Sequence, residues 1–71
     1  MKIHEMWACK YFTVDGKKHL GLFCYHGTIN RAEKELHNII SEPYTKATVL
    51  GHVGSTAEVV LYRSDGFEWM N

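Results

Sequence analysis

This sequence has few cysteines, one proline, no net charge and no long apolar run. Each of these features excludes a class of protein. Two cysteines, Cys9 and Cys24, allow one disulfide at most, which is few for a small secreted domain that depends on such bonds. A single proline and 45% hydrophobic residues argue against disorder. No apolar run approaches the ~20 residues of a membrane span, and the start of the chain lacks the apolar centre of a signal peptide. We therefore expect a cytoplasmic protein with reduced thiols and no membrane contact.

The charge balance excludes a general nucleic-acid coat protein. Eight basic residues match eight acidic ones, so the net charge at pH 7 is zero and the whole molecule offers no long-range attraction to phosphate. With 71 residues the chain can form one small core, which is marginal by itself. We expect one domain over residues 1–71 that relies on large apolar side chains.

An Asp-Gly pair inside alternating apolar runs predicts a first β-hairpin. Asp15 and Gly16 in "VDGK" fit a two-residue loop, and that loop would pair Tyr11 with Leu20 and Trp7 with Cys24. This register gathers one set of side chains on the core face: Trp7, Cys9, Tyr11, Leu20, Leu22 and Cys24. The opposite, outward face would then carry a second set: Met6, Ala8, Lys10, Phe12, Lys17, His19, Phe23 and Tyr25.

A change to helical periodicity after Thr28 predicts one amphipathic helix over about residues 30–41. Apolar residues recur at steps of three and four: Ile29, Ala32, Leu36, Ile39 and Ile40. Asn30 or Thr28 can cap its start, and Pro43 prevents the helix from continuing.

The rest of the chain, after the predicted helix, predicts a second hairpin and a short final strand. Two β-rich runs flank Gly54-Ser55, which suits a two-residue turn. Asp65-Gly66 would bend the chain again, so that Phe67 and Trp69 return to the sheet. The resulting class is α+β with the order ββαββ: an antiparallel sheet of four to five strands with one helix packed on one face.

The outward sheet face and the polar helix face are the predicted partner-binding surfaces. Their candidate residues combine aromatic anchors with positive charges: Lys10, Phe12, Phe23, Tyr25, Arg31 and Lys34. An apolar patch on a sheet face usually marks a partner surface. A homodimer or a curled sheet could cover the same face. Aromatic residues beside lysines also suit single-stranded nucleic acid, although the neutral balance and the lack of a basic cluster make that partner less favoured.

Metal binding and catalysis find little support in the residue pattern. Cys24 and His26 could join Cys9 and either His37 or His4, but the spacings of known zinc sites are absent. Glu33 and Glu35 diverge on the predicted helix, and a thiol-imidazole pair would also need an orienting group and a cleft. We expect no metal, no cofactor, no catalytic residues and no enzymatic activity.

The segment Leu61–Trp69 resembles the C-terminus of the ninth family of anti-CRISPR proteins directed against type I-F systems, which are small phage proteins. The matched residues are Tyr62, Asp65, Gly66 and Trp69, which the resemblance places at the end of a final strand. It implies an inhibitor that acts without catalysis in the host cytoplasm, where it binds a host protein complex, possibly a CRISPR surveillance complex, and blocks its engagement of nucleic acid. The alternative function is a single-stranded nucleic-acid-binding module.

Overall fold

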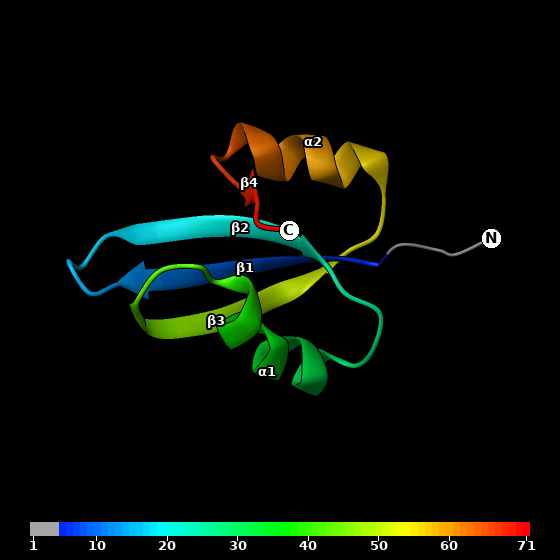
Figure 1. Cartoon of the computed structure of the whole chain (residues 1–71). Coiled ribbons are helices and arrows are strands. Elements are labelled where there is room, and N and C mark those ends of the chain that lie inside the picture. The colour runs from blue at the N-terminus through cyan, green and yellow to red at the C-terminus, as the bar shows by residue number, and fades with distance from the viewer. Residues whose placement is uncertain (1–4) are drawn as a thin grey trace.

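The computed structural model describes residues 5–71 as a four-stranded sheet with two helices (Figure 1). The elements follow in this order: β1 (Met6–Thr13), β2 (Lys18–Cys24), α1 (Ile29–Ile39), β3 (Tyr44–Val53), α2 (Thr56–Ser64) and β4 (Glu68–Trp69). The sheet order is β3-β1-β2-β4. The α+β class is confirmed, but the single helix and the purely antiparallel sheet are corrected, because α2 is a second helix and β4 runs parallel to β2.

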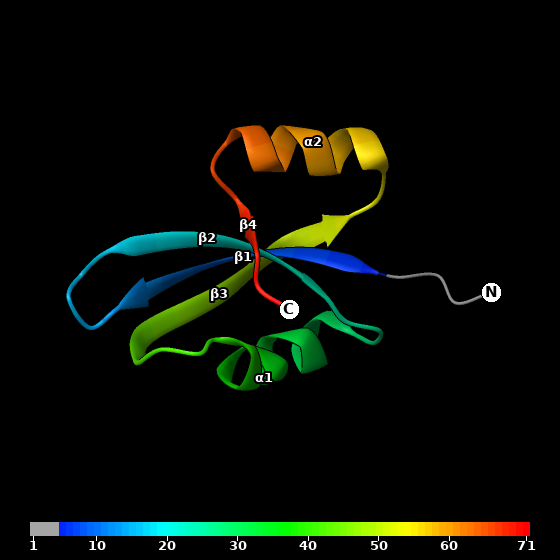
Figure 2. The same cartoon turned by 45° about the horizontal axis from the view of Figure 1, so that its top comes forward.

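The two helices lie on opposite sides of the sheet (Figure 2). On the α1 side, Ala32 and Leu36 pack with sheet residues into one buried cluster. On the α2 side, Val59 and Tyr62 pack against a second, smaller cluster around Leu22. Both faces of the sheet are therefore partly covered. In the described part of the chain, neither helix is long and apolar enough to cross a membrane.

The first hairpin forms where expected, but its register differs by one residue. Thr13 N–H donates to the Lys17 carbonyl at 3.0 Å, and Gly16 N–H donates to the Thr13 carbonyl at 2.9 Å. Only Gly16 in this loop has a positive φ, 85°. A two-residue type I′ loop would need positive φ at Asp15 as well, so the loop has three residues and ends in a glycine bulge. Phe12 consequently pairs with Lys18, and Trp7 with Phe23.

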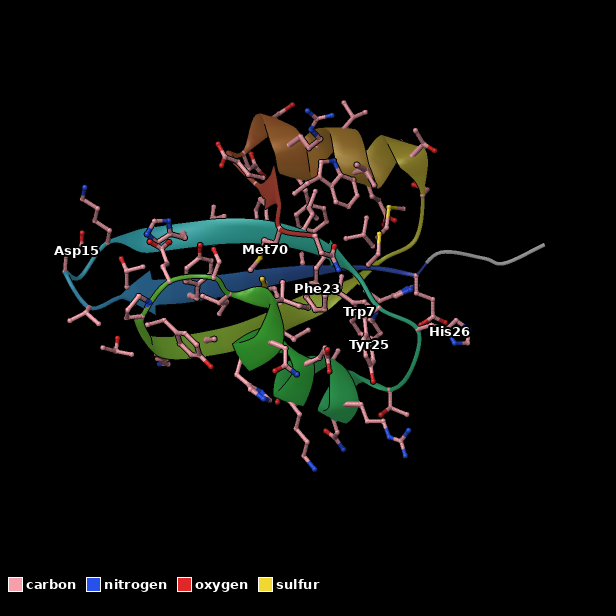
Figure 3. All side chains as sticks on the ribbon, in the orientation of Figure 1. Trp7, Asp15, Phe23, Tyr25, His26 and Met70 are labelled. Atoms are coloured by element: carbon pink, nitrogen blue, oxygen red, sulfur yellow. The ribbon has the colours of Figure 1, made fainter. Side chains whose placement is uncertain are left out.

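This shift exchanges part of the two predicted faces. Trp7, Cys9 and Phe23 point to the α1 side and are buried there, whereas Leu22 turns to the α2 side. The prediction that Phe23 lies on an outward face is wrong, because its side chain is fully buried. Figure 3 shows Trp7, Phe23 and Tyr25 together on the α1 side of the sheet.

The predicted helix is confirmed as α1. It begins one residue earlier and ends two residues earlier than the predicted range 30–41. Thr28 caps it, since its hydroxyl accepts a hydrogen bond from Arg31 N–H at 3.4 Å. Of the predicted apolar stripe, Ala32, Leu36 and Ile40 are buried, while Ile29 at the first position stays exposed.

The predicted second hairpin is wrong: β3 leads into α2 instead. Ser55 caps this helix by accepting from Glu58 N–H at 3.2 Å, while the Glu58 carboxylate accepts from Gly54 N–H at 2.8 Å. This reciprocal capping satisfies the Glu58 N–H in the first turn and the Gly54 N–H just before the helix, and it outweighs the β-branched pair Val59 and Val60 inside the helix.

The Asp65-Gly66 pair ends α2 rather than forming a hairpin turn. Gly66 has φ 97° and donates to the Arg63 carbonyl, while Phe67 N–H donates to the Tyr62 carbonyl, each at 3.1 Å. These two bonds define a Schellman motif, whose expected apolar contact is the edge-to-face pair of Tyr62 and Phe67. Phe67 is buried as predicted, but Trp69 remains 43% exposed.

Candidate anion-binding face of the sheet

The charged residues of the three long strands, histidines aside, are three lysines. They are Lys10 in β1, Lys18 in β2 and Lys46 in β3. Phe12 pairs with Lys18 on one side and with Lys46 on the other. Because directly opposed residues share a face, these side chains form one row across the sheet.

Lys10 belongs to the same face, two residues along β1 from Phe12. Its ammonium nitrogen lies 5.9 Å from the centre of the Phe12 ring, within range of a cation–π contact. We call the four residues Lys10, Phe12, Lys18 and Lys46 the lysine face. It occupies the end of the α2-side surface near the first hairpin, whereas α2 packs over Ala8 and Leu22 at the other end.

The lysine face concentrates positive charge in a neutral protein. In the described part of the chain, the acidic side chains come from loops, the two helices and β4, and the ion pairs found there join Lys17 to Asp15 and His19 to Glu42. Lys18 and Lys46 are exposed, and Lys10 is half-buried. Lysine commonly packs its carbon chain on an apolar surface and keeps the ammonium in water. The face can thus attract an anion without an internal carboxylate neutralising it.

The six predicted partner-binding residues separate into three places. Lys10 and Phe12 lie together on the lysine face. Phe23 is in the core, and Tyr25 is half-buried against the same cluster, with its backbone carbonyl accepting from the Trp7 indole at 3.0 Å.

Arg31 and Lys34 complete the set on α1, where both are exposed. They lie on the other side of the sheet from Lys10, so one flat partner cannot contact all of the predicted residues at once. Sequence reasoning missed Lys18 and Lys46. Strand alternation places them beside Phe12 only once the correct pairing of β1 with β2 and with β3 is known.

The cysteine and histidine candidates are dispersed. Cys9 is buried, Cys24 is exposed, and both are free thiols. The prediction that both cysteines lie on the core face is therefore wrong for Cys24. Over residues 5–71 no group of three metal-binding side chains comes together, and His4 lies outside the described residues. Burial raises the pKa of the Cys9 thiol to about 11, which disfavours the nucleophilic thiolate at neutral pH.

A cleft of about 420 Å³ lies beside the lysine face, along the edge of β2. Tyr11 and His19 form one wall, with their rings stacked 4.8 Å apart, and the Tyr11 hydroxyl donates to the Glu42 carboxylate at 3.2 Å. Burial and this carboxylate raise the pKa of Tyr11, which keeps the phenol protonated. Lys18 also lines the cleft, so it joins the two features.

Comparison with known proteins adds no relative. Searches of protein families, of curated proteins and of solved structures each found no match to this chain.

Proposed function

We propose that this chain is a non-enzymatic binding protein whose lysine face engages an acidic surface of a protein partner. The observation that carries this proposal is the row Lys18–Phe12–Lys46, with Lys10 over the ring. A half-buried aromatic side chain among positive charges suits a partner that offers carboxylates around an apolar side chain.

A protein partner is favoured over single-stranded nucleic acid because the aromatic platform is incomplete. Phe23 and Tyr25 were expected beside Phe12, and both turn to the α1 side. Binding of single strands usually stacks successive bases on several aromatic rings. Phe12 is left as the one ring of the lysine face, and the ammonium of Lys10 already lies near it.

The narrower proposal is an inhibitor of a host defence complex that blocks its engagement of nucleic acid. It rests on the resemblance of residues 61–69 to the anti-CRISPR family. The local structure differs from the expected strand end, because Tyr62 lies in α2, Asp65 is its C-cap and Gly66 follows the cap. The binding role itself does not depend on this resemblance.

The test compares two variants that each lose three positive charges. The face variant carries Lys10→Gln, Lys18→Gln and Lys46→Gln. The control carries Lys17→Gln, Arg31→Gln and Lys34→Gln, at exposed positions outside the lysine face. Each labelled protein is titrated with a poly-glutamate peptide, with oligothymidine of equal charge, and with a purified type I-F surveillance complex, and its anisotropy is followed.

We expect the face variant to lose ~10-fold or more in affinity for poly-glutamate, since three surface pairs at up to ~1 kcal/mol each are removed. The control should stay within ~2-fold, and binding should weaken with salt. Equal losses in both variants would show that the lysine face has no special role. Tighter binding of oligothymidine would favour the nucleic-acid alternative, and binding of the surveillance complex would support the inhibitor role.

A further inference from the structure

We propose that the cleft beside β2 binds an extended peptide segment of the partner, which adds to the sheet as a strand next to Lys18–Leu20. This inference deepens the proposed function and rests on the partner being a protein. Strand addition gives affinity through backbone hydrogen bonds and specificity through the alternating side chains of the bound segment.

Backbone alternation shows which edge groups of β2 are available. The residues that flank β2 bond to the two ends of the β1 segment: Thr13 N–H donates to the Lys17 carbonyl, and Tyr25 N–H donates to the carbonyl of Glu5, just before β1. In an antiparallel pair the bonded positions alternate, so the odd positions of β2 face β1 and the even ones face outward. Lys18 and Leu20 therefore turn backbone groups toward the cleft.

The chain itself already pairs with the rest of this edge. β4 pairs with Gly21 and Leu22, and Met70 N–H donates to the Leu22 carbonyl at 2.9 Å. The Asn71 side chain then replaces a strand at Cys24, where it donates to the carbonyl and accepts from the N–H, each at 2.9 Å. By the same alternation, the pairing of Glu68 with Gly21 uses the Leu20 carbonyl, so the edge groups that β4 leaves are both backbone groups of Lys18 and the N–H of Leu20. A bound segment would continue the line of β4 along these groups.

The cleft lies alongside the strand rather than over one face of the sheet. Tyr11, His19 and Ile39 line it from the α1 side, and Lys18 and Leu20 from the α2 side. Residues from both faces of the sheet line this one cleft because the cleft runs along the edge of β2. Its volume, about 420 Å³, suits a few residues of an extended chain.

The lining specifies an alternating segment. A residue opposite Lys18 would continue the row of Lys46, Phe12 and Lys18, where a carboxylate forms a favourable cross-strand pair. The next residue would point to the α1 side, toward the stacked rings of Tyr11 and His19 and the apolar Ile39. The expected ligand alternates Asp or Glu with an apolar or aromatic residue.

The other sheet edge is a poorer acceptor. The β1–β3 pairing has register shifts beside Cys9 and Thr13, so β3 is interrupted at two places. Such bulges commonly protect an edge against added strands. The same alternation turns Ala47 and Val49 outward on β3, which makes their amides an internal control.

The experiment selects binders from a displayed library of random 12-residue peptides on the immobilised full chain. An enriched peptide is then added to the ¹⁵N-labelled chain, and amide hydrogen exchange is measured. We expect enriched sequences to alternate acidic and apolar residues, and exchange at Lys18 and Leu20 to slow by ~10-fold or more, with Ala47 and Val49 unchanged. Absence of enrichment, or protection at Ala47 and Val49 instead, would overturn the inference.

Two pairs of variants separate strand addition from simple charge attraction. Lys18→Pro and Lys18→Gln both lose the charge, but only the proline loses the outward N–H, so it should bind the peptide ~5-fold or more weakly than the glutamine. If Lys18→Pro does not fold, Ser41→Trp, which fills the cleft, is compared with Asn38→Trp on α1 outside it. Equal affinity within the pair used would overturn strand addition, while the face variant would still test the lysine face independently.

Discussion

Phe12 and Phe23 show how the surroundings of one residue type decide its role. Phe23 has no exposed surface in the α1-side cluster, and Phe12 is half-buried on the lysine face. Truncating a buried phenylalanine leaves a cavity that costs ~3–5 kcal/mol. We expect Phe23→Ala to lower the free energy of unfolding by that amount and Phe12→Ala by less than ~2 kcal/mol. Urea unfolding measures both values. Equal losses would mean that Phe12 belongs to the core.

The buried thiol of Cys9 should make the free energy of unfolding depend on pH in the alkaline range. Burial raises the pKa of its thiol from 9.0 to about 11, so the folded state holds this proton more tightly than the unfolded state. The resulting stabilisation is complete below pH 9 and is lost as the pH rises toward 11. We expect the urea midpoint of the native chain to fall more steeply over this range than that of Cys9→Ala. Parallel curves for the two proteins would contradict the burial of this thiol.

The two thiols should also differ in reactivity, because Cys24 is exposed and Cys9 is buried with its Sγ 3.2 Å from the Met70 sulfur. A thiol reagent at pH 8 should modify one cysteine in the native chain and both in urea. Cys24→Ser should leave the native chain without a rapidly reacting thiol. Rapid modification of Cys24→Ser would show that the cluster around Cys9 opens readily.

The sequence predicted elements better than their pairing. The first hairpin and α1 follow from strong periodicities, and both are present. The register was missed because Asp15-Gly16 fits either a two-residue loop or the last part of a three-residue loop. The second helix was missed because Val59 and Val60 favour strands, while the capping pair Ser55 and Glu58 favours a helix.

The end of α2 depends on a left-handed glycine, and the chain offers a matched control. A Cβ added at Gly66 or at Gly51 would meet no atom within 4 Å, but Gly66 has φ 97°. We expect Gly66→Ala to cost ~1 kcal/mol, whereas Gly51→Ala should be neutral within ~0.5 kcal/mol. Thermal unfolding of both variants checks this difference. Equal effects would show that the helix end does not constrain stability.

Across the whole molecule, the candidate site could be predicted only in part. Lys10 and Phe12 were recognised because strand alternation puts both on the same face of β1, whichever hairpin register is used. Lys18 and Lys46 were not, because a one-residue shift in register decides which strand residues share a face. Long-range pairing of β1 with β3 is also invisible in local sequence patterns. The segregation of positive charge onto one sheet surface therefore emerges only from the complete topology.

Because like charges are gathered on the lysine face, we predict that its lysines contribute to binding but add little to the stability of the fold. Lys18 and Lys46 flank Phe12 with like charge, and their mutual repulsion is stronger at low salt. Lys10 is retained in this test, because its contact with Phe12 could contribute ~0.5–1 kcal/mol. We expect the double variant Lys18→Gln and Lys46→Gln to unfold at an equal or slightly higher temperature, with the difference decreasing as salt is added.

The control is Lys34→Gln on α1, which should show no comparable gain. A loss of more than ~1 kcal/mol in the double variant would instead mean that the lysine stems pack on Phe12 and stabilise the sheet. The face would then be explained by folding alone. Unchanged stability together with weakened binding of poly-glutamate is the combination that the proposed function requires, because folding would then give no reason for the positions of these charges.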